Sequence, residues 1–251
     1  MDRIELLRED AVAILLIDHP SRNLVTRKMI RELAAHVAAL ERDDRVRAAI
    51  VTGAGEADFS GGLDMAEWTS LSAKKAQEEV QVGQDALWAL EHLSKPTIAV
   101  VSGACRGLGV EIALACDVRI AAETSTFSFP EVDVGWMPSH GGTARLSRRV
   151  GRPAAIEILL SGRPVRGIDA LRLGLVDHLT PPGEALALGK DRARAFASKP
   201  AAAARAIKRT LVEGEEKPYR NRFLLEAQHA AQLLWSAEYK DAVARFRGKR
   251  P

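Results

Sequence analysis

Short apolar strands alternate with amphipathic helices along the chain as far as Gly135, and this alternation constrains the fold more than any other feature. The patterns predict strands over residues 4–7, 12–17, 46–52, 97–101 and 118–121. They predict helices over residues 26–42, 75–93 and 107–116. Strands and helices in alternation are typical of an α/β layered fold.

The first of these helices carries clear local signals. Thr26 is a good N-cap because its hydroxyl can accept a hydrogen bond from a free N–H group of the first turn. Apolar residues then recur at helical spacing, at Met29, Ile30, Leu33, Val37 and Leu40. The strand over residues 97–101 is apolar throughout, which predicts that both of its faces are covered.

From Thr143 onward the pattern is almost entirely helical. Helices are predicted over residues 153–160, 168–173, 184–197, 201–211, 220–235 and 238–246, with one further strand over residues 176–179. We therefore expect an α/β core over residues 1–165 and a helical C-terminal region over residues 166–251. These are parts of one body rather than two independent domains.

The composition narrows the class of protein. The chain has 251 residues, of which 47% are hydrophobic, enough to bury a substantial core. No apolar run approaches the roughly 20 residues of a membrane helix, and no secretory signal is apparent at the N-terminus. Two cysteines, Cys105 and Cys116, indicate buried free thiols in a reducing compartment, so we expect a cytoplasmic protein without membrane contact.

Charge and histidine placement exclude further classes. The net charge is +3 and the basic residues form no stripe, so nucleic-acid binding is not expected, whereas an anionic small substrate would suit the excess. The six histidines show no metal-ligand spacing, and no Gly-x-Ser-x-Gly motif is present. We expect neither a metal site nor a serine hydrolase.

Two glutamates in glycine-rich surroundings suggest chemistry. Glu111 lies one turn into a predicted helix that follows Gly107, and Glu131 follows Pro130. Paired carboxylates can hold a water and move protons on and off carbon. The backbone N–H of Leu108, at the start of that helix, is a ready oxyanion donor. The helix dipole alone also favours a glutamate at such a position, so this pattern by itself leaves both interpretations open.

A third segment, Phe-Ser-Gly-Gly-Leu-Asp over residues 59–64, follows a predicted strand. Gly61 and Gly62 would let backbone N–H groups approach a ligand closely. If a thioester carbonyl lay against the N–H of Leu63, that amide would stabilise an enolate oxygen. An ordinary glycine turn is the alternative interpretation.

Taken together, these strings resemble the enoyl-CoA hydratase/isomerase (crotonase) superfamily. The resemblance rests on residues 59–64, 103–112 and 130–146, in this order and spacing. It continues in Pro-Ser-Arg-Asn-Leu at residues 20–24 and in the C-terminal tail from residue 238 to 251. Five motifs in register cover nearly the whole chain.

The resemblance implies a fold and an activity. The fold would be a spiral of β-β-α units with a C-terminal helical region that closes over CoA and forms trimers, often paired into hexamers. The activity would be that of a 2-enoyl-CoA hydratase, which adds water across the C2=C3 double bond of an acyl-CoA thioester. Coenzyme A is part of the substrate, so no separate cofactor is implied.

The resemblance also assigns roles to residues. Glu111 would orient or deprotonate the water for attack at C3, and Glu131 would deliver the proton to C2. The N–H groups of Leu63 and Leu108 would form the oxyanion hole. Because both glutamates are present, hydration is favoured over double-bond isomerisation, hydrolysis or decarboxylation on the same scaffold. A CoA- or RNA-binding protein with residual activity is the alternative from another class.

Further positions follow from the same likeness. Contacts to CoA would come from Arg22, Gly61, Gly62, Asp64, Gly107, Phe246 and Lys249. The acyl pocket would be lined by Trp68, Trp88, Trp136 and His140, with Met65 nearby.

Some residues depart from the family pattern. Leu108 replaces a usual glycine, and Ser139 with His140 replaces a small pair before two glycines. His140 is expected to cap the following helix rather than to touch substrate, because polar residues are preferred at such positions. Arg106 replaces an apolar residue and is expected to face solvent rather than a carboxylate of the acyl chain.

Overall fold

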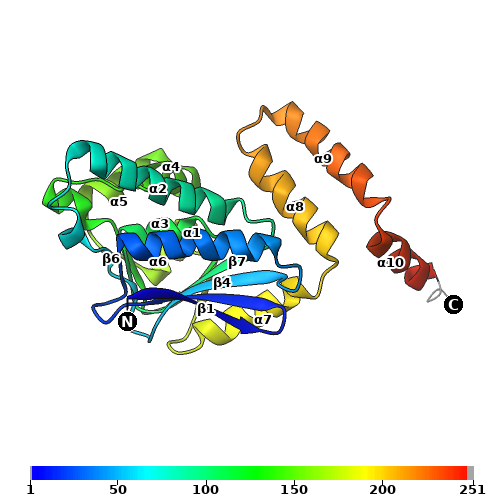
Figure 1. Cartoon of the computed structure of the whole chain (residues 1–251), viewed down its shortest axis with the longest axis horizontal. Coiled ribbons are helices and arrows are strands. Elements are labelled where there is room, and N and C mark those ends of the chain that lie inside the picture. Colours follow the sequence, from blue (N-terminus) through cyan, green and yellow to red (C-terminus); the bar gives the residue numbers. More distant parts are fainter. Residues whose placement is uncertain (1, 248–251) are drawn as a thin grey trace.

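The core is a six-stranded sheet in the order β1-β2-β4-β7-β9-β12 (Figure 1). The structure, a computed structural model, describes residues 2–247. The strands are β1 (Arg3–Glu9), β2 (Val12–Asp18), β4 (Ala48–Gly53), β7 (Thr97–Val101), β9 (Val118–Ala122) and β12 (His178–Thr180). β1 and β2 form an antiparallel hairpin, and the other neighbours are parallel. Every residue of β7 is buried, which confirms the prediction from its apolar sequence.

A second sheet of four short strands runs in the order β11-β10-β8-β5. Its strands are β5 (Asp58–Ser60), β8 (Ala104–Arg106), β10 (Thr126–Ser128) and β11 (Val165–Arg166), and a separate parallel pair joins β3 (Leu24–Val25) to β6 (Gly62–Leu63). The sequence analysis predicted none of these strands. Two or three residues are too few to establish the two-residue alternation by which strands are recognised.

The two sheets are built by one repeating unit. β4 enters the large sheet, β5 enters the small one, and helix α2 (Ala73–Glu91) follows. β7, β8 and helix α3 (Leu108–Leu114) repeat the pattern, and β9 with β10 repeat its two strands. The fold is therefore the expected spiral of β-β-α units.

Helices cover both faces of the large sheet. Alternate strand residues such as Leu15 and Val51 pack in one cluster with α1 (Arg27–Arg42) and α2. Their neighbours, such as Ile14 and Ile50, pack with α7 (Ala185–Ala197). The five apolar positions predicted for α1 are its buried residues, and the Met29 N–H donates to the Thr26 hydroxyl as expected of an N-cap. This two-sided burial explains why the central strands are apolar throughout.

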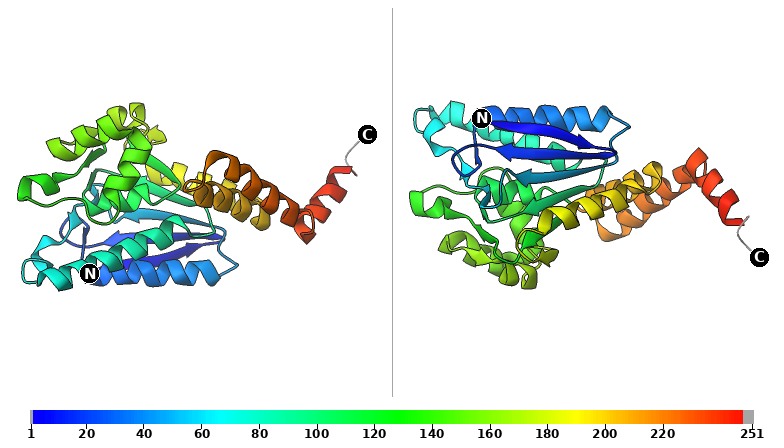
Figure 2. Two further views of the ribbon diagram at one scale, coloured as in Figure 1. Left: turned by 90° about the horizontal axis from the view of Figure 1, so that it is seen from above. Right: turned by 90° about the horizontal axis from the view of Figure 1, so that it is seen from below.

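The C-terminal half is helical, as expected. The remaining elements are α4 (Gly142–Val150), α5 (Arg152–Ser161), α6 (Gly167–Arg172), α8 (Ala201–Gly214), α9 (Tyr219–Leu233), α10 (Ala237–Arg247) and the short 3-10 helices η1 (Met65–Glu67) and η2 (Pro130–Val134). α7 packs on the sheet, whereas α8, α9 and α10 extend away from it (Figures 1 and 2). No helix within residues 2–247 is long and apolar enough to cross a membrane.

Asn23 anchors the segment that contains β5 and leads into Gly61 and Gly62. Its backbone is left-handed, with φ of 53°, and its side-chain amide donates to the carbonyls of Ala54 and Asp58 at 2.9 and 2.7 Å. Its own carbonyl accepts from the Ser60 hydroxyl at 2.7 Å. One buried residue therefore holds the chain on both sides of β5.

Replacing Asn23 with Ala is expected to destabilise the protein by roughly 3 kcal/mol, because three side-chain hydrogen bonds are lost and a left-handed backbone is kept without its favoured side chain. Urea unfolding would measure the change in the free energy of unfolding. Lys28→Ala, on an exposed position of α1, is the control, and equal stabilities of the two variants would contradict the anchoring role.

Candidate active site

Two backbone turns meet beside the start of α3. Gly62 has a φ of 100°, and a Cβ atom on it would lie 3.0 Å from the Arg106 carbonyl oxygen. A Cβ on Gly109 would lie 2.8 Å from the Cβ of Ser60. These close approaches bring Leu63 and Leu108 to the same region. Leu108 is the first residue of α3, so its N–H has no acceptor within the helix.

Glu111 is a buried carboxylate held by backbone donors. It lies in the first turn of α3 and is only 1% exposed. The N–H groups of His140 and Gly142 both donate to its Oε1 at 2.8 Å. Gly142 is required for this approach, because a Cβ there would lie 2.8 Å from the same oxygen. The two donors therefore fix the position of this oxygen beside the start of α4.

Glu131 lies opposite, in η2, in a different environment. A side chain on Gly107 would collide with its Oε1, and its Oε2 is buried without a hydrogen-bond partner. The pKa of Glu131 is raised to about 7, chiefly by burial and to a smaller extent by the negative charge of Glu111, while a backbone hydrogen bond acts to lower it. The site therefore pairs a hydrogen-bonded carboxylate with a carboxyl group that retains a proton near neutrality.

Three aromatic rings adjoin this pair. The His140 ring is buried, with Nδ1 3.6 Å from Oε2 of Glu111. Trp68 contacts it edge-on, with centroids 6.1 Å apart, and contacts Trp136 in the same way at 6.5 Å. The expectation that His140 caps the next helix is wrong. The N-cap of α4 is Gly141, without a side-chain capping bond, and the ring turns instead toward Glu111.

The structure does not bring Trp88 to this group. Trp88 is 48% exposed on α2 and stacks on His92, with ring centroids 3.9 Å apart. The buried face of α2 is formed by Glu79, Gly83, Ala86, Leu87 and Leu90. Helical spacing therefore places Trp88 outside the packed side of the helix.

Arg106 does not face solvent freely, which corrects the expectation for it. Its side chain is 29% exposed and lies 3.5 Å from Asp58, which also pairs with Arg22 at 3.0 Å. The two arginines therefore share one carboxylate at the rim of the glycine turn. Arg22 itself is more exposed and has a left-handed φ of 57°.

The other predicted CoA contacts lie in two separate parts of the chain, the turn at Gly62 and the C-terminal region. Gly61 and Asp64 flank the turn at Gly62, and the Asp64 carboxylate accepts from the Ala66 N–H to cap η1. Phe246 lies in the last turn of α10. Lys249 lies outside the described residues.

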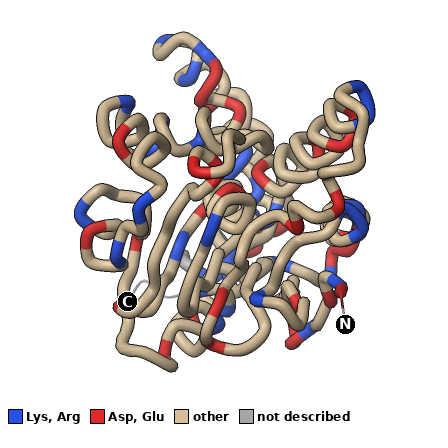
Figure 3. Tube along the Cα trace, turned by 90° about the vertical axis from the view of Figure 1, so that its left-hand side faces the viewer, with Lys and Arg blue, Asp and Glu red and all other residues tan. Residues whose placement is uncertain are grey.

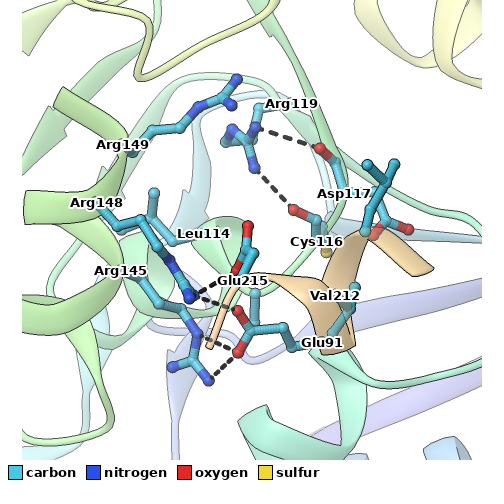
Figure 4. Close-up of a pocket in the computed structure, with 12 residues that line it drawn as sticks. Glu91, Leu114, Cys116, Asp117, Arg119, Arg145, Arg148, Arg149, Val212 and Glu215 are labelled. Atoms are coloured by element: carbon cyan, nitrogen blue, oxygen red, sulfur yellow. Dashed lines mark hydrogen bonds and ion pairs between the residues drawn. The ribbon is translucent and has the colours of Figure 1, made fainter. Parts of the chain in front are cut away.

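A separate cavity of about 360 Å³ opens at the other end of α3 (Figure 4). Arg145 and Arg148 in its wall both pair with Glu91, and Arg119 and Arg149 both pair with Asp177. Each of these arginines is engaged in an ion pair, and Arg148 also pairs with Glu215, so this cavity is an ion-paired structural region rather than an extension of the glutamate site. Among the described residues no cluster of His, Cys, Asp or Glu is placed to hold a metal.

The sequence analysis missed Gly83 and Gln84 of α2. A side chain on Gly83 would collide with the His140 ring, and the Gln84 amide donates to the Ser139 carbonyl at 2.8 Å. An isolated glycine inside an otherwise helical pattern is the signal that pointed to a close approach here.

The likeness to known proteins agrees with this geometry. The family model described as enoyl-CoA hydratase/isomerase matches residues 8–251. The chain belongs to the enoyl-CoA hydratase/isomerase family.

Individual family members resemble the chain over nearly their full lengths. It is 32% identical to a short-chain-enoyl-CoA hydratase of Clostridium acetobutylicum, covering 100% of this chain and 96% of that protein. It is 34% identical to a crotonyl-CoA hydratase of Syntrophomonas wolfei, covering 99% and 96%. The crystal structure of an enoyl-CoA hydratase from Bacillus anthracis superposes with a TM-score of 0.93 at 26% identity, covering 98% and 96%.

The raised pKa of Glu131 has a consequence for stability. A carboxyl whose pKa is higher in the folded than in the unfolded state loses its stabilising contribution as the pH rises from about 4.5 to about 7. Glu131→Gln removes this loss. As the pH rises from 4.5 to 7.5, we expect the free energy of unfolding of the variant to increase by about 2 kcal/mol relative to that of the wild type. Unfolding free energies at both pH values measure it, and an equal slope for both proteins contradicts it.

Proposed function

We propose that the protein is a 2-enoyl-CoA hydratase, which adds water across the C2=C3 double bond of an acyl-CoA thioester. The observation that carries the proposal is the unequal pair of carboxylates. Glu111 is arranged as a base by two N–H donors, and the pKa of Glu131 is raised to about 7 so that it can hold a proton. Addition of water to a conjugated double bond needs one group in each state.

The proposed reaction uses the pair in one sequence of proton transfers. The thioester carbonyl accepts from the N–H groups of Leu63 and Leu108, which draws electron density from C3. The water oxygen attacks C3 while Glu111 takes one of its protons, and the enolate oxygen is stabilised by the same two N–H groups. Glu131 then gives its proton to C2. The product is a 3-hydroxyacyl-CoA, and proton exchange with solvent restores both glutamates.

CoA recognition is proposed for residues around the glycine turns and the chain end. The backbone at Gly61, Gly62, Asp64 and Gly107 would approach the thioester and the adenosine portion. Arg22 is more than half exposed, so its guanidinium can exchange Asp58 for a phosphate. Phe246 and Lys249 would close over CoA from the C-terminal region. No separate cofactor enters this scheme.

The acyl group is proposed to be short. Trp68, Trp136 and His140 crowd the space next to Glu111, as their edge contacts indicate. Large aromatic walls leave little room for a long chain. A role in fatty acid metabolism in the cytoplasm is consistent with such a substrate.

A homotrimer or homohexamer is proposed, assembled through the extended helices. α8, α9 and the connection from α9 to α10 expose many large apolar side chains, among them Ile207, Leu211, Phe223, Leu224 and Trp235. Exposed apolar surface on this scale is typical of an interface between chains. The division into a core over residues 1–165 and a closing, trimerising region over residues 166–251 belongs to this proposal, with α8 to α10 as its extended part.

Two alternatives are weaker. Isomerisation of a 3-enoyl thioester needs only one proton carrier and could survive on Glu131 alone, whereas Glu111 is built into the site as firmly as Glu131. RNA binding would need a basic surface, and on the face drawn in Figure 3 basic and acidic segments are interspersed. A filter-binding assay across salt concentrations tests RNA binding, because phosphate contacts produce a steep salt dependence.

Hydration is tested with crotonyl-CoA by following the ultraviolet absorbance of the enoyl thioester. We expect the wild type to remove the absorbance, and Glu111→Gln and Glu131→Gln to lower kcat by roughly 10²–10⁴-fold, since each removes one proton carrier. If both variants still hydrate crotonyl-CoA at the wild-type rate, the roles proposed for Glu111 and Glu131 are contradicted. Isomerisation of a 3-enoyl thioester by Glu111→Gln would instead favour the alternative chemistry.

The pH dependence tests which glutamate is the acid. Glu131 must be protonated to serve C2, so kcat/KM is expected to fall as the pH rises above about 7. Initial rates between pH 5 and pH 9.5 at low substrate concentration measure it. A profile that stays flat across this range would exclude Glu131 as the proton donor with its raised pKa.

A further inference from the structure

The scheme above leaves one buried titratable side chain of the site unused. His140 and Glu111 are each only 1% exposed, and the His140 Nδ1 lies 3.6 Å from the Glu111 Oε2. The Ser139 hydroxyl lies 3.2 Å from the same nitrogen. The other oxygen of Glu111, Oε1, already accepts two backbone N–H groups. The imidazole therefore faces Oε2, the Glu111 oxygen that accepts no backbone hydrogen bond.

The neighbouring helices leave a space that fits the His140 ring. α2 has a glycine, Gly83, where any side chain would collide with the ring. The next residue, Gln84, donates to the Ser139 carbonyl at 2.8 Å and holds the loop against the helix. On the other side, Arg145 of α4 donates to the His140 carbonyl at 2.9 Å. The loop that carries the ring is thus held by hydrogen bonds from α2 and α4.

The surroundings of the ring favour one tautomer. The His140 Nε2 is buried without a hydrogen-bond partner. A proton on Nε2 would leave a buried N–H unsatisfied, whereas a proton on Nδ1 can be donated to the Ser139 hydroxyl at 3.2 Å.

The charges that face the ring agree with this form. Glu111 from α3 is the charged group in contact with it, and Glu131 from η2 lies beyond. The residue of α2 under the ring is Gly83, and η1 is followed by the neutral Trp68. Arg145 of α4 reaches the carbonyl, and its charge is paired with Glu91.

We propose that His140 is a positioning residue for Glu111. Its buried ring packs with Nδ1 3.6 Å from Oε2 and restricts the orientation of the carboxylate that serves as the base. At 3.6 Å the contact is longer than a hydrogen bond, so Oε2 keeps room to accept from the attacking water. The inference rests on the proposed function for its meaning in catalysis, and its structural content is independent of activity.

The decisive measurement is the carboxyl ¹³C chemical shift of Glu111 at a fixed pH, assigned with Glu111→Gln. Three variants keep the backbone N–H of residue 140 and change only the ring. His140→Ala removes the group that contacts Oε2, and we expect the Glu111 carboxyl signal to move and broaden as the carboxylate loses its fixed orientation. His140→Asn keeps an amide donor at the Nδ1 position and is expected to stay close to the wild type. His140→Gln places its amide nearer the Nε2 position and is expected to resemble Ala.

Kinetics supply the second measurement. With crotonyl-CoA, His140→Ala is expected to lower kcat roughly 10-fold with little change in KM. His92→Ala, which alters a histidine on the outer side of α2, is the matched control and should leave both readouts unchanged. Thermal melts establish that each variant is folded.

The outcomes separate the two hypotheses. An unchanged Glu111 carboxyl signal in folded His140→Ala overturns the positioning role, as does an Asn variant that behaves like Ala. A changed Glu111 signal in a protein whose wild type hydrates no enoyl thioester supports the positioning role and contradicts the proposed function. If His140→Ala should fail to fold, Gly83→Ala displaces the same ring from α2, and the same change in the Glu111 carboxyl signal is expected.

Discussion

The burial of the Glu111 carboxylate against the N–H groups of His140 and Gly142 is the contact on which the rest of the site depends. A buried charge needs donors, and here they come from a loop about thirty residues further along the chain. α3 and α4 must therefore pack closely, and Gly142 leaves the necessary space. This packing places His140 beside the carboxylate and Glu131 across from it.

Glu111 and Glu131 are the same residue type, and only their surroundings give them different proposed roles. Glu111 has donors on one oxygen and a ring facing the other, whereas one oxygen of Glu131 is buried without any partner. The resulting difference in proton affinity is what addition of water to an enoyl thioester requires. Gly107 stands between the acids, and its left-handed backbone with φ of 48° lets the chain turn into α3 without touching Glu131.

Local patterns predicted the long elements well and the short ones poorly. The α1 helix, with its Thr26 cap and five buried residues, follows from helical spacing, and β7 follows from five apolar residues in a row. The small sheet was missed because its two- and three-residue strands are stabilised by pairing with distant segments. His140 and Arg106 were misjudged for a related reason: capping and exposure preferences describe an average environment, and neither predicts a carboxylate brought in by folding.

The sequence by itself determined the family, the order of the glycine turns, and the presence of Glu111 and Glu131, because these depend on residue identity and spacing. Only the tertiary structure decided that the pKa of one glutamate is raised to about 7, that Arg22 and Arg106 share Asp58, and that Trp88 lies apart from Trp68. Desolvation, charge neighbours and packing are properties of segments that meet in space. They have no signature within the few residues on either side of a position.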